Sequence, residues 1–462
     1  MLTLHKLNLI GPSTTVRVST AEATLQRRPM AWRDPTTVAM ALAAHWGPEG
    51  LIWLDGDGSN LGRWITLGAD PLEQHCCRGL PGQPGASDPF AQLEQLGPGH
   101  WCGWLSYEAA AWVEPASHWK ADAMASLWIA RHDPVLRFDL QRRQLWIEGQ
   151  DPQRLEAMAR WLEASSGAPQ PQPRPSLAEE RWHWHSDTDS FAAGVERLRE
   201  LIAAGDLFQA NLTACCSTEL PADGPAGAAA ALPLFLQLRS RCPAPFSGLV
   251  IAGAAANGEA VISASPERFL QLGPGGTVET RPIKGTRPRQ ADPQRDADQA
   301  AELVCSAKDR AENVMIVDLL RNDLGRVCVP GSIDVPQLVG LESYPQVHHL
   351  TSVVTGHLRP DCTWVDLLRA CWPGGSISGA PKLRACQRLA ELEPVARGPY
   401  CGSLLRRDWD GSVDSSILIR SLLLRGRQLR CHGGCGIVAD SNPQAEAEEL
   451  GWKLHPLLEA LA

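Results

Sequence analysis

The sequence predicts a mixed α/β fold, built as one large domain with two lobes. The chain has 462 residues, enough for an ample core, and 44% of them are hydrophobic. Residues 1 to about 150 are rich in strand patterns, whereas short strands alternate with helices from Phe246 onward. The chain shows no internal repeat of about 20 to 50 residues, which argues against a solenoid or a propeller.

The first lobe is predicted to contain a strand, a hairpin and a group of core tryptophans. Residues 51–54 form an apolar run that ends at the turn Asp55-Gly56-Asp57-Gly58. Residues 135–148 have the pattern of a hairpin. Four tryptophans are expected to pack in the core: Trp101, Trp104, Trp112 and Trp128.

A proline-rich stretch marks the boundary between the lobes. Residues 155–164 look helical, and residues 165–175 (SSGAPQPQPRP) have the composition of an exposed linker. We therefore place an N-terminal lobe at residues 1–165, a linker at 166–186 and a C-terminal domain at 187–462.

Two helices of the C-terminal domain have clear end signals. One is predicted to stop at Gly205, because four apolar residues recur before it at helical spacing: Phe191, Val195, Leu198 and Ile202. The last helix begins at Asn442-Pro443, a cap followed by proline. Its apolar stripe consists of Leu450, Leu454, Leu457 and Leu461.

The overall charge argues against a nucleic-acid binder. At a net charge of -9, the chain has no basic excess to neutralise phosphates. No apolar run approaches the roughly 18 residues of a membrane span. The first 21 residues alternate like a strand and lack the apolar block of a secretory signal. We expect a cytoplasmic protein that binds neither nucleic acid nor membrane.

The segment ETRPIKGTRP, residues 279–288, presents one lysine between a proline and a glycine. Pro282 lacks an N–H and Gly285 permits backbone angles closed to other residues, so Lys284 is predicted to lie at a tight turn. A free lysine, with a pKa near ~10.4, is almost entirely charged at pH 7. Burial or neighbouring cations would raise the neutral, nucleophilic fraction. Taken alone, such a lysine is more often a solvated loop residue.

Two predicted helices carry paired carboxylates three residues apart. The pairs are Asp309 with Glu312 and Glu446 with Glu449, and Lys453 lies one turn beyond the second pair. The first pair also fits a capping box, and the second fits acids that complement a helix dipole. The functional alternative is that these carboxylates meet across the fold and hold Mg²⁺, a hard cation that prefers oxygen ligands.

Two glycine-rich segments, 373–382 and 433–437, are candidate anion sites. Both could offer backbone N–H groups, the first if a helix begins near Pro381. Neither matches the phosphate loop or the dinucleotide fingerprint.

Four motifs together resemble the chorismate-utilising enzymes. They are DRAENVMIVDLLRNDLGRV at 309–327, VHHL at 347–350, PGGSISGAPK at 373–382 and GIVADS at 436–441. The resemblance covers roughly residues 187–461 and extends weakly to WLSYE at 104–108. It implies antiparallel sheets packed face to face with helices outside, and a catalytic role for the C-terminal domain.

The resemblance also implies roles for the acids and the lysine. Glu312 and Glu449 would hold Mg²⁺ on the ring carboxylate of chorismate, with Asp309 and Glu446 in supporting positions. Glu267 would be the general acid for the leaving hydroxyl. Lys284 would add covalently to the ring before ammonia displaces it.

Further positions match the substrate site of the family. Arg420 and Lys453 would meet substrate carboxylates, and Arg420 suits a bidentate contact. His349, Asn211 and Gly436 also match positions of that site.

Three positions depart from the family pattern. Cys435 stands where glycine or alanine is usual, and Arg406 replaces a frequent tyrosine. Leu54-Asp55-Gly56 differs from the run found in relatives that bind regulatory tryptophan.

Lys284 decides between branches of the family. The segment PIKGT, residues 282–286, resembles the branch that aminates chorismate at its hydroxyl-bearing carbon, towards p-aminobenzoate and folate. The branch that forms anthranilate has alanine at this position. The alternatives are anthranilate formation, isochorismate or salicylate formation, and a non-catalytic scaffold. We find no Gly-x-Cys-x-Gly nucleophile turn of a glutamine amidotransferase, which implies a separate glutaminase subunit, component II, as partner.

Overall fold

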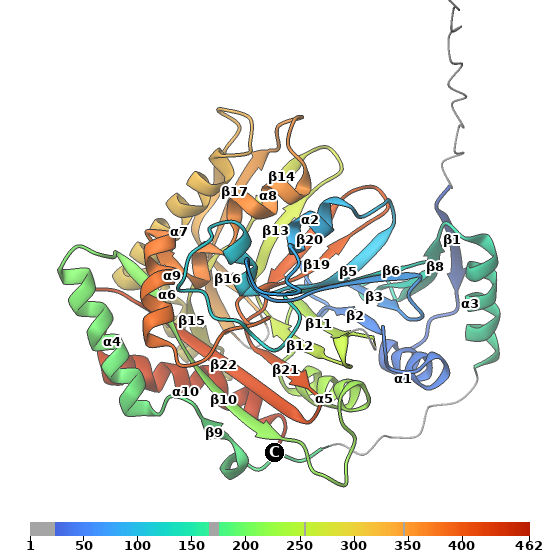
Figure 1. Cartoon of the computed structure of the whole chain (residues 1–462), viewed down its shortest axis with the longest axis horizontal. Coiled ribbons are helices and arrows are strands. Elements are labelled where there is room, and N and C mark those ends of the chain that lie inside the picture. The colour runs from blue at the N-terminus through green and yellow to red at the C-terminus, as the bar shows by residue number, and fades with distance from the viewer. Residues whose placement is uncertain (1–23, 166–174, 254–255, 345–346) are drawn as a thin grey trace, which may run out of the picture.

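The computed structural model describes residues 24–165, 175–253, 256–344 and 347–462. Figure 1 shows two large sheets with helices on the outside. Every strand pair named below is antiparallel, so the predicted architecture is confirmed.

Within the described residues, the first sheet, called sheet A, has twelve strands. Their order is β1 (Gln26–Met30), β8 (Gln144–Gly149), β7 (Val135–Asp139), β3 (Trp64–Gly68), β2 (Ile52–Asp55), β11 (Phe246–Ile251), β12 (Ala260–Ser265), β21 (Ser421–Arg425), β22 (Gln428–Ile437), β10 (Gln209–Glu219) and β18 (Gly379–Ala380), with β9 (His183–Trp184) also on β10.

The second sheet, called sheet B, has ten strands in the same described part of the chain. Their order is β15 (Ile283–Pro288), β17 (Val347–His357), β14 (Thr277–Thr280), β13 (Arg268–Leu272), β20 (Val413–Ile417), β19 (Ser403–Arg407), β5 (His100–Leu105), β6 (Leu127–His132) and β4 (Glu73–Cys77), with β16 (Asp334–Ser343) also on β17.

Helices flank both sheets (Figure 1). Those beside sheet A are α1 (Pro35–Trp46), α3 (Pro152–Ala164), α4 (Thr188–Ala203), α5 (Ala228–Arg241), α9 (Lys382–Leu392) and α10 (Pro443–Glu459). Those beside sheet B are α2 (Pro89–Glu94), α6 (Pro293–Cys305), α7 (Ala307–Gly325) and α8 (Trp364–Cys371). Short 3₁₀ turns lie at η1 (Tyr107–Trp112), η2 (Glu179–Arg181) and η4 (Gly375–Ile377). No helix of the described chain is long and apolar enough to cross a membrane.

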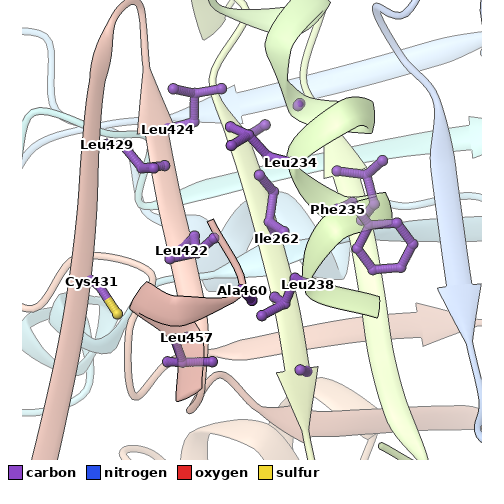
Figure 2. Packing of buried hydrophobic residues seen from close by; sticks show 14 of the residues in the cluster. Leu234, Phe235, Leu238, Ile262, Leu422, Leu424, Leu429, Cys431, Leu457 and Ala460 are labelled. Carbon is purple, nitrogen blue, oxygen red and sulfur yellow. The ribbon is translucent and has the colours of Figure 1, made fainter. Parts of the chain in front are cut away.

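Alternation along the strands of sheet A creates two cores. Ile262 of β12 and Leu422 of β21 pack against the helices on the outer face, as Figure 2 shows. The residues next to them, Val261 and Leu423, belong to the core shared with sheet B. A Cβ placed on Gly248 of β11 would lie 2.8 Å from Leu404 of β19, so the two sheets are in direct contact. Period-two patterning therefore buries both faces of the sheet.

The predicted local elements are largely confirmed. The hairpin is β7 with β8, and the helices around residues 155–164 and 191–202 are α3 and α4. The last helix is α10, and its predicted cap is present, because the Asn442 side chain accepts from the N–H groups of Gln444 and Ala445. Trp104 and Trp128 stack in the core with ring centroids 5.6 Å apart.

Both sheets combine strands from either side of the predicted linker at 166–186. In sheet A, β11 pairs with β2, and in sheet B, β19 pairs with β5. The two segments therefore share one folded unit. The boundary itself stays a prediction, and residues 166–174, like the predicted strand at the N-terminus, lie outside the described residues.

Candidate active site

Lys284 lies within a strand, so the predicted tight turn is wrong. In β15, Lys284 pairs with Leu350 of β17, and the register shifts immediately afterwards. Gly285 supplies the shift with a φ of 80°, which makes a bulge rather than a turn. A Cβ on Gly285 would lie 2.9 Å from Asp309. The glycine therefore lets the start of α7 approach the strand.

The side chain of Lys284 is half-buried and points towards the glycine-rich segment. Its Nζ donates a hydrogen bond to the carbonyl of Ser376 in η4, at 3.2 Å. The side chain of the same serine hydrogen-bonds Glu267, which follows β12 and is buried. Lys284 and Glu267 thus meet at Ser376, a residue to which the sequence reasoning gave no role, although it lies in the motif at 373–382.

Glu267 has the properties of an acid that works near neutral pH. Burial raises the pKa of its carboxyl to about 7, against the opposing effects of the Ser376 hydrogen bond and the Lys284 charge. A carboxyl with this pKa is protonated in a large fraction of molecules at pH 7 and can donate that proton.

Glu312 and Asp309 lie on α7. The helix is capped by Ser306, whose side chain accepts from the N–H of Asp309, so the capping box led by Asp309 is wrong. Glu312 is buried, and burial raises the pKa of its carboxyl despite the opposing charges of Lys284 and Lys308. Asp309 is half-buried and lies 3.7 Å from the guanidinium of Arg287.

The second acid pair lies in the first two turns of α10. Lys308 Nζ contacts Glu446 at 2.7 Å and Lys453 Nζ contacts Glu449 at 2.7 Å. Burial alone would raise the pKa of Glu449, but the charges of Lys453, Lys308 and Lys284 outweigh it and lower that pKa. Both helices therefore direct carboxylates towards a shared set of ammonium groups.

Gly436 of β22 lies where these groups converge. A Cβ there would be 3.4 Å from Lys284 Nζ, 3.1 Å from Glu312 Oε2 and 2.7 Å from Gln209 Nε2. Gly436 faces Asn211 of β10 in the strand register. Glycine at 436 therefore lets the side chains of Gln209, Glu312 and Lys284 approach the strand closely. Gln209 is a further neighbour that the sequence motifs did not indicate.

Lys453 of α10 contributes an ammonium group to the candidate site. Its Nζ donates to the carbonyl of Gly434 at 2.9 Å and lies 3.8 Å from Cys435 Sγ. Burial would lower the pKa of Lys453, but the opposing effects, which include the charge of Glu449 and its hydrogen bond, outweigh burial and raise it, so the ammonium stays charged.

Arg420 and His349 are neighbours, because the charge of Arg420 contributes to lowering the pKa of His349. Arg420 has a φ of 50° between β20 and β21 and makes no ion pair with any described carboxylate. Burial lowers the pKa of Arg420, against an opposing effect of Cys242. His349 is buried, its Nδ1 lies 2.8 Å from the Thr286 hydroxyl, and burial together with Arg420 lowers its pKa to about 3. A guanidinium with no described carboxylate partner beside a neutral imidazole is suited to an anion.

Among the described residues, the side chains close enough together to share an ion include two of the predicted carboxylates, Glu446 and Glu449, but not Glu312 or Asp309. Carboxylate oxygens are the ligands that Mg²⁺ prefers. Ligand atoms of Glu446, Glu449 and Cys435 lie within 4.8 Å of one another. Lys308 and Ser441 both contact Oε1 of Glu446 and leave Oε2 for another partner. Burial raises the pKa of Cys435 to about 12, so it stays a neutral thiol and not the thiolate that softer metals need.

The comparisons with known proteins agree with this fold. The profile of the chorismate binding enzyme family matches residues 29–459, so the chain belongs to this family. The chain is 39% identical to "Aminodeoxychorismate synthase component 1" of Klebsiella aerogenes over 86% of this chain and 84% of the relative. It is 41% identical to the protein of that name in Escherichia coli (strain K12), over 71% of this chain and 69% of the relative.

Among solved structures, the chain is similar to anthranilate synthase component I from Streptococcus pneumoniae TIGR4. The TM-score is 0.73 at 27% identity, covering 86% of this chain and 92% of that chain. The protein is therefore a chorismate-utilising enzyme by family and fold.

Proposed function

We propose that this protein aminates chorismate at its hydroxyl-bearing carbon and forms 4-amino-4-deoxychorismate, as component I of an aminodeoxychorismate synthase. The observation that carries the proposal is the position of Lys284, whose Nζ lies beside Gly436, Glu312 and the Ser376–Glu267 pair. The names of the relatives from Klebsiella aerogenes and Escherichia coli support the same reaction.

In this proposal Lys284 is the nucleophile and Glu267 is the general acid. The neutral amine of Lys284 forms a bond to the ring carbon next to the one that bears the carboxylate. The ring hydroxyl leaves as water with the proton of Glu267, whose raised pKa keeps that proton available near pH 7. Ammonia then bonds to the carbon that lost the hydroxyl, and the bond to Lys284 breaks.

Substrate binding is assigned to the cationic residues Arg420 and Lys453 together with their neighbours. Arg420, which has no described carboxylate partner, meets one substrate carboxylate in a bidentate contact. Lys453 is proposed to supply a second charge from α10, and His349 and Asn211, both buried, are proposed to line the site. The neutral imidazole of His349 leaves the Arg420 charge for the substrate.

Glu312 and Glu449 are proposed to hold Mg²⁺, with Asp309 and Glu446 in support. When bound, the ion would withdraw electron density through the ring carboxylate as the hydroxyl departs. The ammonium groups of Lys308 and Lys453 contact Glu446 and Glu449, and the charge of Lys453 lowers the pKa of Glu449. The ammonia is proposed to come from a separate glutaminase subunit.

The rival function is anthranilate formation, because the similar solved structure bears that name. The deciding experiment incubates the purified chain with chorismate, Mg²⁺ and ammonium chloride and identifies the product by mass, before and after adding the lyase that releases pyruvate. We expect a product that yields p-aminobenzoate only after the lyase is added. Direct formation of anthranilate would refute the proposal, and glutamine without a partner should give no product.

A further inference from the structure

Arg397 is a deeply buried arginine to which the proposed chemistry gives no role. It lies between α9 and β19, and only 1% of it is exposed. Glu393, the residue at the C-cap of α9, accepts hydrogen bonds from Nε and Nη2 of this arginine at 2.9 Å and 2.6 Å. Each nitrogen contacts a different carboxylate oxygen, so the pair is bidentate. This geometry fixes both the position and the plane of the guanidinium.

The same guanidinium joins two segments of the proposed active site. Its Nη1 donates to the carbonyl of Ile377 in η4, and its Nη2 donates to the carbonyl of Asn211 in β10, each at 2.7 Å. The residue before Ile377 is Ser376. The carbonyl of Ser376 accepts from Lys284 at 3.2 Å, and its side chain hydrogen-bonds Glu267. One guanidinium therefore connects β10 to the segment that contacts the proposed nucleophile and general acid.

Glu393 also holds β10 directly. Its Oε1 accepts from the backbone N–H of Thr213 at 3.0 Å, two residues beyond Asn211 along the strand. Asn211 faces Gly436 of β22 in the register of the sheet. Because Glu393 is buried as well, these hydrogen bonds are shielded from water, which strengthens them. The pair therefore fixes β10 at two points beside the candidate site.

The N-terminal part of the chain holds Arg397 through η1. The central carbon of the guanidinium lies 4.5 Å from the centroid of the Tyr107 ring, which is a cation–π contact. Oε1 of Glu108 accepts from the backbone N–H of Arg397 at 2.8 Å. Both residues belong to the motif WLSYE at 104–108. These contacts connect that motif to the active site, a link that the proposed function did not supply.

We propose that Arg397, held by Glu393, is a positioning residue that fixes η4 against β10 and so places Ser376 for its contacts with the nucleophile and the general acid. Three nitrogens of the guanidinium contact two backbone carbonyls and two carboxylate oxygens. Lysine carries its donors on a single nitrogen and cannot span the same four acceptors. The inference deepens the proposed function and rests on it only for the identity of the product.

The kinetic test compares Arg397→Lys with Arg137→Lys. Arg137 is also buried, and it hydrogen-bonds Thr66 and Asp408, neither of which belongs to a segment of the candidate site. Turnover is measured per folded chain, at a temperature well below the unfolding transition of each variant. In Arg397→Lys, kcat should fall about 10²-fold, the effect of misplacing reacting groups by about 1 Å. Arg137→Lys should keep the wild-type kcat.

Chorismate binding and the pH profile separate positioning from a loss of stability. The dissociation constant for chorismate, measured without ammonium, should stay close to the wild-type value, because the proposed carboxylate contacts come from Arg420 and Lys453. Burial raises the pKa of Glu267, and the hydrogen bond of Ser376 is the largest opposing effect. A displaced Ser376 should therefore raise this pKa further, so that the alkaline fall in kcat of Arg397→Lys moves to higher pH. Variants that are only less stable should keep the wild-type profile.

Glu393→Gln is a second variant that leaves the arginine in place. Its amide oxygen can still accept from the Thr213 N–H, but it no longer offers two charged oxygens to Arg397. It should lower kcat and move the pH profile in the same direction as Arg397→Lys. A wild-type kcat, an unchanged pH profile or a parallel loss of chorismate binding in the folded variants would overturn the inference. If the wild-type chain forms anthranilate, the proposed function fails, while the same comparison with that product still tests Arg397.

Discussion

Replacing Glu267 with glutamine should make the protein more stable above neutral pH and much less active. Burial raises the pKa of this carboxyl from 4.5 to about 7, so the fold favours the protonated form. For a group with a raised folded pKa, the stabilisation is fully present below the unfolded pKa of 4.5 and is lost as pH rises to 7. The difference of about 2.5 units, at about 1.4 kcal/mol per unit, corresponds to about 3 kcal/mol.

The same substitution, Glu267→Gln, should lower kcat. At pH 7 about half of the Glu267 carboxyls carry a proton, whereas an ordinary glutamic acid at the same pH would be protonated in roughly 0.3% of molecules. Glutamine cannot donate that proton, so Glu267→Gln should lower kcat by about 10²- to 10⁴-fold. In the wild type, kcat should fall as pH rises above 7, because the acid is lost by ionisation.

The assay measures urea unfolding and initial rates from pH 5 to 8.5. Rates are taken at a constant concentration of free ammonia, so that the nucleophile does not change with pH. The stability difference between Glu267→Gln and the wild type should grow by about 2 to 3 kcal/mol across this range. Glu180→Gln, an exposed control, should show no such growth. A difference that stays constant with pH, or a variant that keeps the alkaline fall in kcat, would refute the reasoning.

Three further changes test the remaining parts of the site. Lys284→Ala should abolish or greatly slow amination at the hydroxyl-bearing carbon, with leakage towards anthranilate detected by mass spectrometry; aminodeoxychorismate at the wild-type rate would exclude a covalent role. Gly436→Ala places a Cβ 2.7 Å from Gln209 and should lower kcat/KM at least about tenfold while the unfolding free energy falls by about 1 to 3 kcal/mol; an unchanged kcat/KM would place the substrate elsewhere. Glu449→Gln should raise the Mg²⁺ concentration for half-maximal activity by about tenfold or more, unlike Glu448→Gln on the exposed side of α10; equal behaviour of the two would contradict the metal assignment.

The sequence was sufficient to predict helices whose ends and apolar faces are marked by their own residues. The helix α10 follows from a cap, a proline and an apolar stripe, and the structure places its N-cap at Asn442. Strand partners are different, because β2 pairs with β11 from the far side of the predicted linker and nothing in either segment specifies the other. The arrangement of the two sheets was available only through the family resemblance.

The errors near the site have physical causes. Pro282 and Gly285 are typical of a turn, but the positive φ of Gly285 serves a bulge in β15 instead. Asp309 fits a cap by composition, yet Ser306 three residues earlier takes that position and leaves Asp309 inside α7. In each case two local solutions suit the same residues, and packing between β15 and α7 selects one.

The positions of Lys284 and Glu267 make their required protonation states compatible. Attack needs a neutral amine at Lys284, whereas departure of the hydroxyl needs a proton on Glu267. The positive charge of Lys284 lowers the pKa of Glu267, so loss of that charge raises it. Glu267 therefore holds its proton more firmly in the molecules whose lysine is ready to attack. Because Ser376 touches both side chains, this coupling depends on the glycine-rich segment that holds the serine in place.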